Sequence, residues 1–217
     1  NVGTTITACL VSANEWAGAL KPDFFAPFIL GIGAFIITFS NKQKMTQKAE
    51  IAVGFGILFI GLSSMSSSIG VYQDSPVFYK AFQVLGGNPI LGILVGAVVT
   101  AIIQSSSASV GILQTLAMRG IVNWRSAIFI TLGQNIGTCI TAILSSAGAN
   151  KTAKRAAVIH LSFNVLGAAI YGVIMTIFFG IFPDLAMQHI SSTQISIFHS
   201  IFNISVTILL FPFANAL

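Results

Sequence analysis

The sequence predicts an all-α integral membrane protein built from inverted-topology repeats, with a re-entrant helical hairpin and broken helices. The 217 residues are 55% apolar and only 7% charged, with a mean hydropathy of +0.91, whereas soluble domains carry about 25% charged residues. A cluster of polar residues interrupts a long apolar run, and one ten-residue segment occurs twice. The net charge of +5 therefore bears on orientation in a lipid bilayer, and we expect no nucleic-acid partner.

Five apolar segments are expected to cross the bilayer as single helices, because about 20 apolar residues span its hydrocarbon core. Residues 1–10 are also apolar. Residues 41–50 and 72–88 are predicted as loops, the second with a short surface helix. The predicted crossings are residues 24–40, 51–71, 126–149, 156–182 and 193–214.

Residues 89–118 form a longer segment with polar side chains in its middle. Thirty residues are too many for one comfortable crossing, and the run from Gln104 to Ser109 would face hydrocarbon that offers it no hydrogen bonds. Two interpretations compete. The segment is either one long tilted helix or a re-entrant hairpin that leaves the membrane on the side where it entered.

The distribution of basic residues favours the hairpin. Lysine and arginine concentrate in cytoplasmic loops, and one crossing over residues 89–118 would place the two strongest basic clusters on opposite sides. A hairpin places both clusters on one side, although Arg119 and Arg125 then face outward. The clusters are Lys42, Lys44 and Lys48, and Lys151, Lys154 and Arg155.

A repeated segment gives a second reason to expect a transporter fold. Residues 1–10 and 135–144 are identical at seven of ten positions, and under the predicted topology they run in opposite directions. Inverted repeats of this kind are typical of secondary transporters, whose substrate lies near the midplane. A helix-packing motif of small residues would also be rich in Gly, Thr and Ala, but it does not explain two such similar, opposed copies.

The repeat divides the chain into two parts. Residues 1–72 are expected to hold the end of the first inverted repeat and its connecting spans, with the first hairpin expected upstream of Asn1. Residues 73–217 are expected to hold the second repeat, including the hairpin at 89–118.

A second pair of motifs has the pattern His-x-x-Phe-Asn, at His160–Asn164 and His199–Asn203. A histidine and an asparagine four residues apart share one face of a helix. We expect both histidines to be packing residues, and the asparagines to be site residues or to hold helices together. One histidine per helix without an acidic neighbour is a poor zinc site.

The polar residues of different segments fall at one depth. The midplane lies about ten residues from either surface, and no Asp or Glu lies in any predicted span. The sequence therefore shows no motif that would indicate acid–base catalysis. Amide and hydroxyl oxygens suit a hard monovalent cation, and hydroxyls with helix N-termini suit an anion. The residues at this depth are Gln104, Ser105, Ser106, Ser107, Asn135, Asn164 and Asn203, joined through pseudo-symmetry by Asn1, Thr4 and Thr5.

These motifs carry a resemblance. Gln-Ser-Ser-Ser at residues 104–107, followed about thirty residues later by Gly-x-Asn-Ile-Gly-Thr at residues 133–138, resembles the type II sodium/phosphate cotransporter family. The duplicated Asn-x-Gly-Thr and the paired His-x-x-Phe-Asn are similar to the same family. The resemblance implies sodium-coupled uptake of inorganic phosphate by alternating access in a plasma or inner membrane. A homo-oligomer or a PhoU-like regulator is a further partner that it leaves open.

The resemblance also suggests roles for individual residues. We assign Gln104 and Ser107 to sodium, and Ser105 and Ser106 to phosphate. Asn135 and Thr138 serve both ions, Asn1, Thr4 and Thr5 join the phosphate site, and Asn164 and Asn203 are secondary candidates. Residues 14–19 lack the Asp of electrogenic animal members, so the charge stoichiometry stays open.

Two other functions remain as alternatives. The first is a passive channel or exporter for phosphate or another small anion, which would not require sodium. The second is a non-transporting membrane sensor, which would bind phosphate without moving it.

Overall fold

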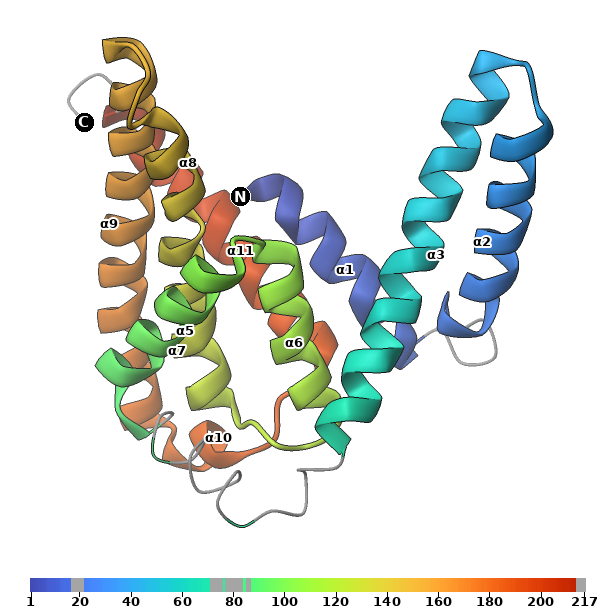
Figure 1. Ribbon diagram of the computed structural model, residues 1–217. Coiled ribbons are helices and arrows are strands. Elements are labelled where there is room, and N and C mark those ends of the chain that lie inside the picture. Colours follow the sequence, from blue (N-terminus) through green and yellow to red (C-terminus); the bar gives the residue numbers. More distant parts are fainter. Residues whose placement is uncertain (17–21, 71–75, 77–83, 85–86, 214–217) are drawn as a thin grey trace.

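The computed structural model describes residues 1–16, 22–70, 76, 84 and 87–213, and its ordered elements in these ranges are helices (Figure 1). In chain order they are α1 (Val2–Trp16), α2 (Pro22–Phe39), α3 (Gln43–Gly70), α5 (Pro89–Ile103), α6 (Ser106–Met118), α7 (Trp124–Gly137), α8 (Cys139–Ser146), α9 (Lys151–Ile181), α10 (Pro183–Met187), α11 (Ser192–Leu210) and the 3₁₀ turn η2 (Phe211–Phe213).

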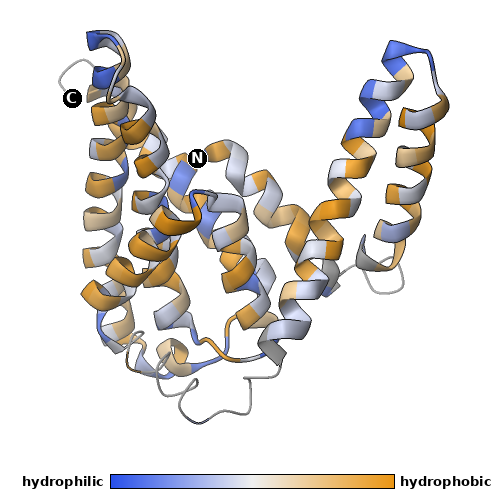
Figure 2. Ribbon diagram, viewed as in Figure 1, coloured by the Kyte–Doolittle hydropathy of each residue, from blue (hydrophilic) through white to orange (hydrophobic). Residues whose placement is uncertain are grey.

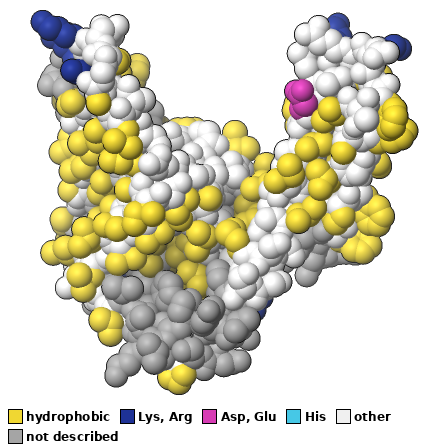
Figure 3. Space-filling view, in the orientation of Figure 1, with side chains coloured by type: hydrophobic (Ala, Val, Ile, Leu, Met, Phe, Trp, Pro, Cys, Tyr) yellow, Lys and Arg dark blue, Asp and Glu magenta, His cyan; other side chains and the backbone are white. Residues whose placement is uncertain are grey.

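The helices form a multi-pass membrane protein. Four described segments are long and apolar enough to cross a bilayer, namely Gln43–Ser68, Trp124–Ser146, Lys151–Ile181 and Ser192–Phe213. Apolar residues run along these helices and remain exposed on the outer faces of α2, α3 and α9 (Figures 2 and 3). Phe35 and Ile174, for example, are 63% and 50% exposed, as expected for side chains that face lipid.

Two helices begin earlier than the hydropathy predicts. Residues 41–50 were expected to form a loop, but α3 begins at Gln43, and α9 begins at Lys151. Lys, Gln, Glu and Ala are strong helix formers, so the helices continue past the apolar part that marks the crossing. The surface helix expected within residues 72–88 falls almost entirely outside the described residues.

The re-entrant hairpin is confirmed. Helices α5 and α6 turn back at Gln104 and Ser105, and their far ends both lie at the lower side of the molecule in Figure 1. Asn88 caps α5 by accepting hydrogen bonds from the backbone amides of Ile90 and Leu91 at 2.9 and 3.4 Å. Ser105 caps α6 by accepting from the amide of Ala108 at 3.2 Å. Both half-helices therefore begin at side chains that satisfy their first amides.

Helix α5 packs directly on the backbone of α7. A Cβ atom added at Gly133 would lie 1.9 Å from the carbonyl oxygen of Ile93, and one added at Gly96 would lie 2.1 Å from that of Ile130. Only glycine permits this approach, which is the small-residue packing seen between membrane helices. The hairpin is thus fixed against α7, whose residues Ile128 and Leu132 are fully buried.

The two copies of the repeated segment run in opposite directions. Along the colour gradient of Figure 1, α1 descends from the N-terminus, whereas α7 and α8 ascend. The break between α7 and α8 is slight, because Thr138 keeps helical dihedral angles (φ −61°, ψ −22°) and donates its backbone N–H to the carbonyl of Gln134.

The two basic clusters lie at one side of the molecule, as the hairpin requires. Figure 3 shows Lys and Arg side chains at the two upper extremities, where the turn between α2 and α3 and the start of α9 lie (Figure 1). Arg119 follows α6 at the opposite side and donates through Nε to the hydroxyl of Ser66 on α3 at 3.1 Å.

Candidate functional site

The two copies of the repeat meet at their equivalent polar residues. Asn1 Nδ2 donates to Asn135 Oδ1 at 3.3 Å. The hydroxyl of Thr138 donates to the carbonyl of Asn135 at 2.6 Å and lies 3.4 Å from Asn1 Oδ1. Asn1 also donates to the side chain of Asn164 on α9. Segments 134 residues apart in the chain therefore share one polar junction.

The tip of the hairpin joins this junction. Ser106, the first residue of α6, shares a 3.2 Å hydrogen bond with the hydroxyl of Thr4 on α1. A narrow pocket, closed to a water-sized molecule in this structure, lies at this meeting point. It is lined by Asn1, Thr4, Ser106, Val110, Gln134, Asn135, Thr138 and His199. Five of these residues, Asn1, Thr4, Ser106, Asn135 and Thr138, are predicted site residues.

Gln134 and His199 are lining residues that the sequence analysis did not assign to the site. Gln134 is 3% exposed, and its Nε2 donates to the carbonyl and the hydroxyl of Ser109 at 2.9 and 3.0 Å. Its Oε1 is buried and has no hydrogen-bond partner in the described part of the chain. This oxygen is an acceptor available to a bound cation. Its position beside Asn135 in the Gly133–Thr138 motif was the available signal.

His199 is buried among the helices, as expected of a packing residue, and it also lines the narrow pocket. It is 2% exposed, and its Nε2 lies 3.3 Å from Asn135 Oδ1. The sequence shows two similar His-x-x-Phe-Asn motifs, but only the one on α11 places its histidine against the narrow pocket. No sequence pattern separates the two histidines, because the difference arises from which helices pack together.

Gln104, Ser105, Ser107 and Thr5 are predicted site residues that do not line the narrow pocket. Gln104 is exposed at the hairpin tip, while Ser105 caps α6 and Ser107 is half-buried beside it. Thr5 is buried, and its hydroxyl donates to the carbonyl of Val2 within its own helix at 2.6 Å.

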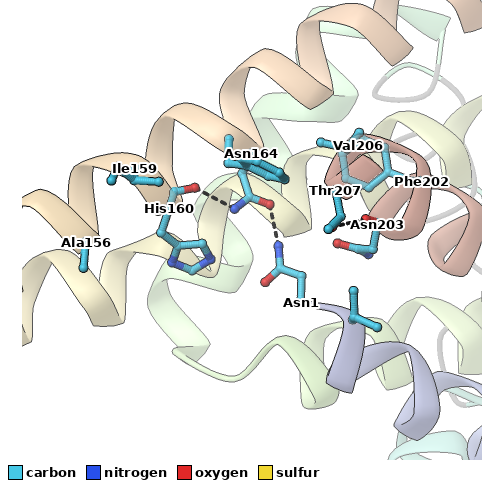
Figure 4. A pocket seen from close by; sticks show the side chains of 11 residues that line it. Asn1, Ala156, Ile159, His160, Asn164, Phe202, Asn203, Val206 and Thr207 are labelled. Carbon is cyan, nitrogen blue, oxygen red and sulfur yellow. Dashed lines mark hydrogen bonds between the residues drawn. The ribbon is translucent and has the colours of Figure 1, made fainter. Parts of the chain in front are cut away.

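A wider cavity of about 450 Å³ adjoins the narrow pocket at Asn1 (Figure 4). Its polar groups include Asn164 and Asn203, the two secondary candidates, which donate to the carbonyls of His160 and His199 at 2.8 and 2.9 Å. Phe163, Phe202 and other apolar side chains form much of its wall. The cavity therefore combines an apolar surface with a few polar groups, and it shares Asn1 with the narrow pocket.

A second buried amide holds the hairpin in place. The side-chain nitrogen Nε2 of Gln114, on α6, lies within 3.2 Å of four oxygen atoms that belong to α1 and α11. These oxygens are the carbonyls of Ala8 and Ser192 and the hydroxyls of Ser192 and Ser196. Gln114 therefore ties the returning half-helix to both neighbouring helices.

The narrow pocket has donors and acceptors but no charged side chain among its lining residues. Hydroxyls from Thr4, Ser106 and Thr138 can donate to an anion or accept from one. Carbonyl oxygens of Asn135 and Gln134 can coordinate a cation. An anion alone would be uncompensated here, so the chemistry favours an anion and a cation together.

Comparison with known proteins places these features in a family. A family model described as Na+/Pi-cotransporter matches residues 1–67 and 75–209. An uncharacterized protein of Bacillus subtilis, YqeW, is 30% identical over 99% of the chain and 67% of its own length. The "Sodium-dependent phosphate transport protein 2A" of Rattus norvegicus is 32% identical over 59% of the chain and 22% of its own length.

A third relative carries a different functional name. The "Putative inorganic phosphate export protein YjbB" of Salmonella typhimurium is 23% identical over 99% of the chain and 38% of its own length. The chain thus spans less than half of this relative and of the rat protein. No solved structure matches the chain at a significant level.

Proposed function

The chain belongs to the Na+/Pi-cotransporter family, and from that premise we propose that it is a secondary active transporter that couples sodium entry to the uptake of inorganic phosphate. Sodium is its coupling ion, and alternating access is its mechanism. The single observation that supports this most strongly is the neutral pocket at the meeting point of the hairpin tip and the two repeat copies.

In this proposal, phosphate binds at the start of α6. Ser106 and Thr4 bring two hydroxyls together there, and the first amides of a helix carry partial positive charge that favours an anion. Ser105 lies next to them, although its hydroxyl already caps the amide of Ala108. This arrangement supports the assignment of Ser105 and Ser106 to phosphate.

In this proposal, sodium binds on the α7 side of the pocket. Asn135 Oδ1, Gln134 Oε1 and the Thr138 hydroxyl are neutral oxygens within about one turn at the end of α7, and hard cations bind such oxygens. Gln104 and Ser107 at the tip complete this set in our proposal. The two ions would then lie close together, and each would lower the electrostatic cost of burying the other.

Alternating access requires two halves that can rock about the site. The opposed directions of α1 and α7–α8, together with a hairpin that ends inside the molecule, are the features by which inverted-repeat transporters do this. The pocket residues come from α1, α6, α7 and α11, so a relative motion of these helices opens or closes the site.

Export is the second candidate, and the name of the Salmonella relative favours it. Purified protein reconstituted into liposomes separates the candidates. We expect labelled phosphate to accumulate when an inward sodium gradient is applied, and not when potassium replaces sodium. Equal flux in both salts would instead indicate a channel or a sodium-independent exporter, and phosphate binding without flux would indicate a sensor.

A further inference from the structure

His199 stands out among the buried groups for which the proposed function gives no role. It lies on α11 against the narrow pocket, and it is the titratable side chain among the described residues that line that pocket. Its ring contacts Asn135, the residue at the centre of the junction between the two repeat copies.

The hydrogen on His199 can be located from its neighbour. Asn135 Nδ2 donates to the carbonyl of Thr131 at 2.9 Å, which fixes the orientation of the Asn135 amide. Asn135 Oδ1 therefore faces His199, and this oxygen can only accept. His199 Nε2 must carry the hydrogen, so the histidine presents an N–H donor at the pocket.

Asn135 Oδ1 accepts from two donors at once in this structure. They are His199 Nε2 and Asn1 Nδ2, each at 3.3 Å. The positive ends of both N–H bonds thus point at the oxygen that we assign to sodium, and they oppose a cation there. Both bonds lie at the long end of the N–H···O range, so a stronger acceptor can replace Asn135 at little cost.

Phosphate is such an acceptor. A charged oxygen binds an N–H donor more strongly than a neutral amide oxygen does. When the surrounding helices separate enough to admit a phosphate, an ion held by Ser106 and Thr4 would lie in the same pocket as His199. It would then compete with Asn135 for the histidine's hydrogen.

Building on the proposed function, we propose that His199 couples the two ions. When phosphate binds, the Nε2–H of His199 leaves Asn135 Oδ1 and donates to a phosphate oxygen. Asn135 Oδ1 then has one donor fewer, with Asn1 Nδ2 remaining, and its released lone pair coordinates sodium. By thermodynamic linkage, sodium on Asn135 equally favours the histidine's donation to phosphate. His199 is thus a binding residue whose effect appears in the cooperativity between the ions.

His160 provides a matched comparison within the same chain. It occupies the equivalent place in its His-x-x-Phe-Asn motif, but it lies on the wider cavity and not on the narrow pocket. Its side chain forms no hydrogen bond with any other described residue. We therefore expect no coupling role for it.

Two polar substitutions test the proposal. The terminal amide nitrogen of glutamine can occupy the place of His199 Nε2, whereas asparagine is one methylene too short. Phosphate affinity is measured by calorimetry at low and at saturating sodium, and the ratio of the two Kd values gives the coupling. We expect His199→Gln and His160→Gln to keep the parent ratio, and His199→Asn to reduce it at least about tenfold.

Each outcome bears on a separate claim. An unchanged ratio in His199→Asn, or a loss of phosphate affinity that is equal at all sodium concentrations, overturns the coupling role. If the phosphate affinity of the parent protein does not change with sodium concentration, the proposed function is overturned instead. If His199→Asn does not fold, His199→Phe keeps an aromatic ring at this position and removes the N–H, and the same predicted reduction applies to it.

Discussion

Gln104 ends α5 in a conformation that glycine adopts more easily. Its dihedral angles are φ 57° and ψ 21°, and it is the non-glycine residue with positive φ in the described part of the chain. This conformation costs an ordinary residue about 1–2 kcal/mol. A glutamine at such a position suggests that the side chain is needed for something other than the turn.

Replacing Gln104 by glycine separates the two roles. We expect Gln104→Gly to melt at the parent temperature or slightly above it, because the strain at the turn is relieved. We also expect it to raise the sodium concentration required for phosphate binding about ten- to a hundredfold, the effect of losing one contact to a charged group. Thermal melting and phosphate binding at graded sodium measure the two effects.

A structural glutamine should behave in the opposite way, and Gln114 supplies the control. Its amide bridges α6 to α1 and α11, so Gln114→Ala should lower the melting temperature and leave the sodium requirement unchanged. A Gln104→Gly protein with the parent's sodium requirement would refute the assignment of Gln104 to sodium.

At the residue scale, the sequence predicted that equivalent residues of the repeated Asn-x-Gly-Thr motif lie together, but not which other side chains line the same pocket. Asn1, Asn135 and Thr138 were found because two copies of one motif imply equivalent positions, and these residues touch. Gln134 has no duplicated partner in residues 1–10, and the duplicated motif of His199 does not show which of its two histidines lines the pocket. Their roles depend on which side of a helix faces the pocket, and contacts between helices decide this.

At the scale of elements, the hairpin depends on its contact with α7. We expect Gly133→Ala to destabilise the protein by about 1–3 kcal/mol or more, because the new methyl group would lie 1.9 Å from the backbone oxygen of Ile93. Backbone atoms cannot move aside as a flexible side chain can, so α5 must shift away. The measurement is the melting temperature of the purified variant.

Gly54→Ala on α3 is the matched control, because an added Cβ at Gly54 meets nothing within 4 Å. It should match the parent or be slightly more stable, since alanine is the better helix former. If both variants melt alike, the close packing of α5 on α7 is not what holds the hairpin.

The elements were predictable where charge and length constrain them. The hairpin followed from 30 residues between two basic clusters, and the structure confirms it. The helix starts at Gln43 and Lys151 were missed. Hydropathy indicates which residues contact lipid. It does not detect the polar residues by which a helix continues beyond the membrane.

At the scale of the whole molecule, the fold fixes which loops share a side of the membrane. Single cysteines at Lys44 and Lys154 should react with an impermeant maleimide from the cytoplasm, in a background without Cys9 and Cys139. A cysteine at Asp184 on α10 should react from outside, because α10 lies at the opposite side (Figure 1). All three side chains are exposed.

Labelling of positions 44 and 154 from opposite sides would contradict the hairpin and the inverted repeat together. Labelling of all three positions from one side would contradict the placement of α10. Intact cells and inverted membrane vesicles provide the two directions of access.

The central claim is that one neutral pocket binds sodium and phosphate together, and calorimetric titration of the purified protein with phosphate tests it most directly. We predict binding in sodium that weakens at least about tenfold when potassium replaces it, and a further loss of the sodium effect in Asn135→Ala, which removes the oxygen shared by both repeat copies. Phosphate binding of equal strength in the two salts, or an Asn135→Ala protein that binds like the parent, would contradict the claim.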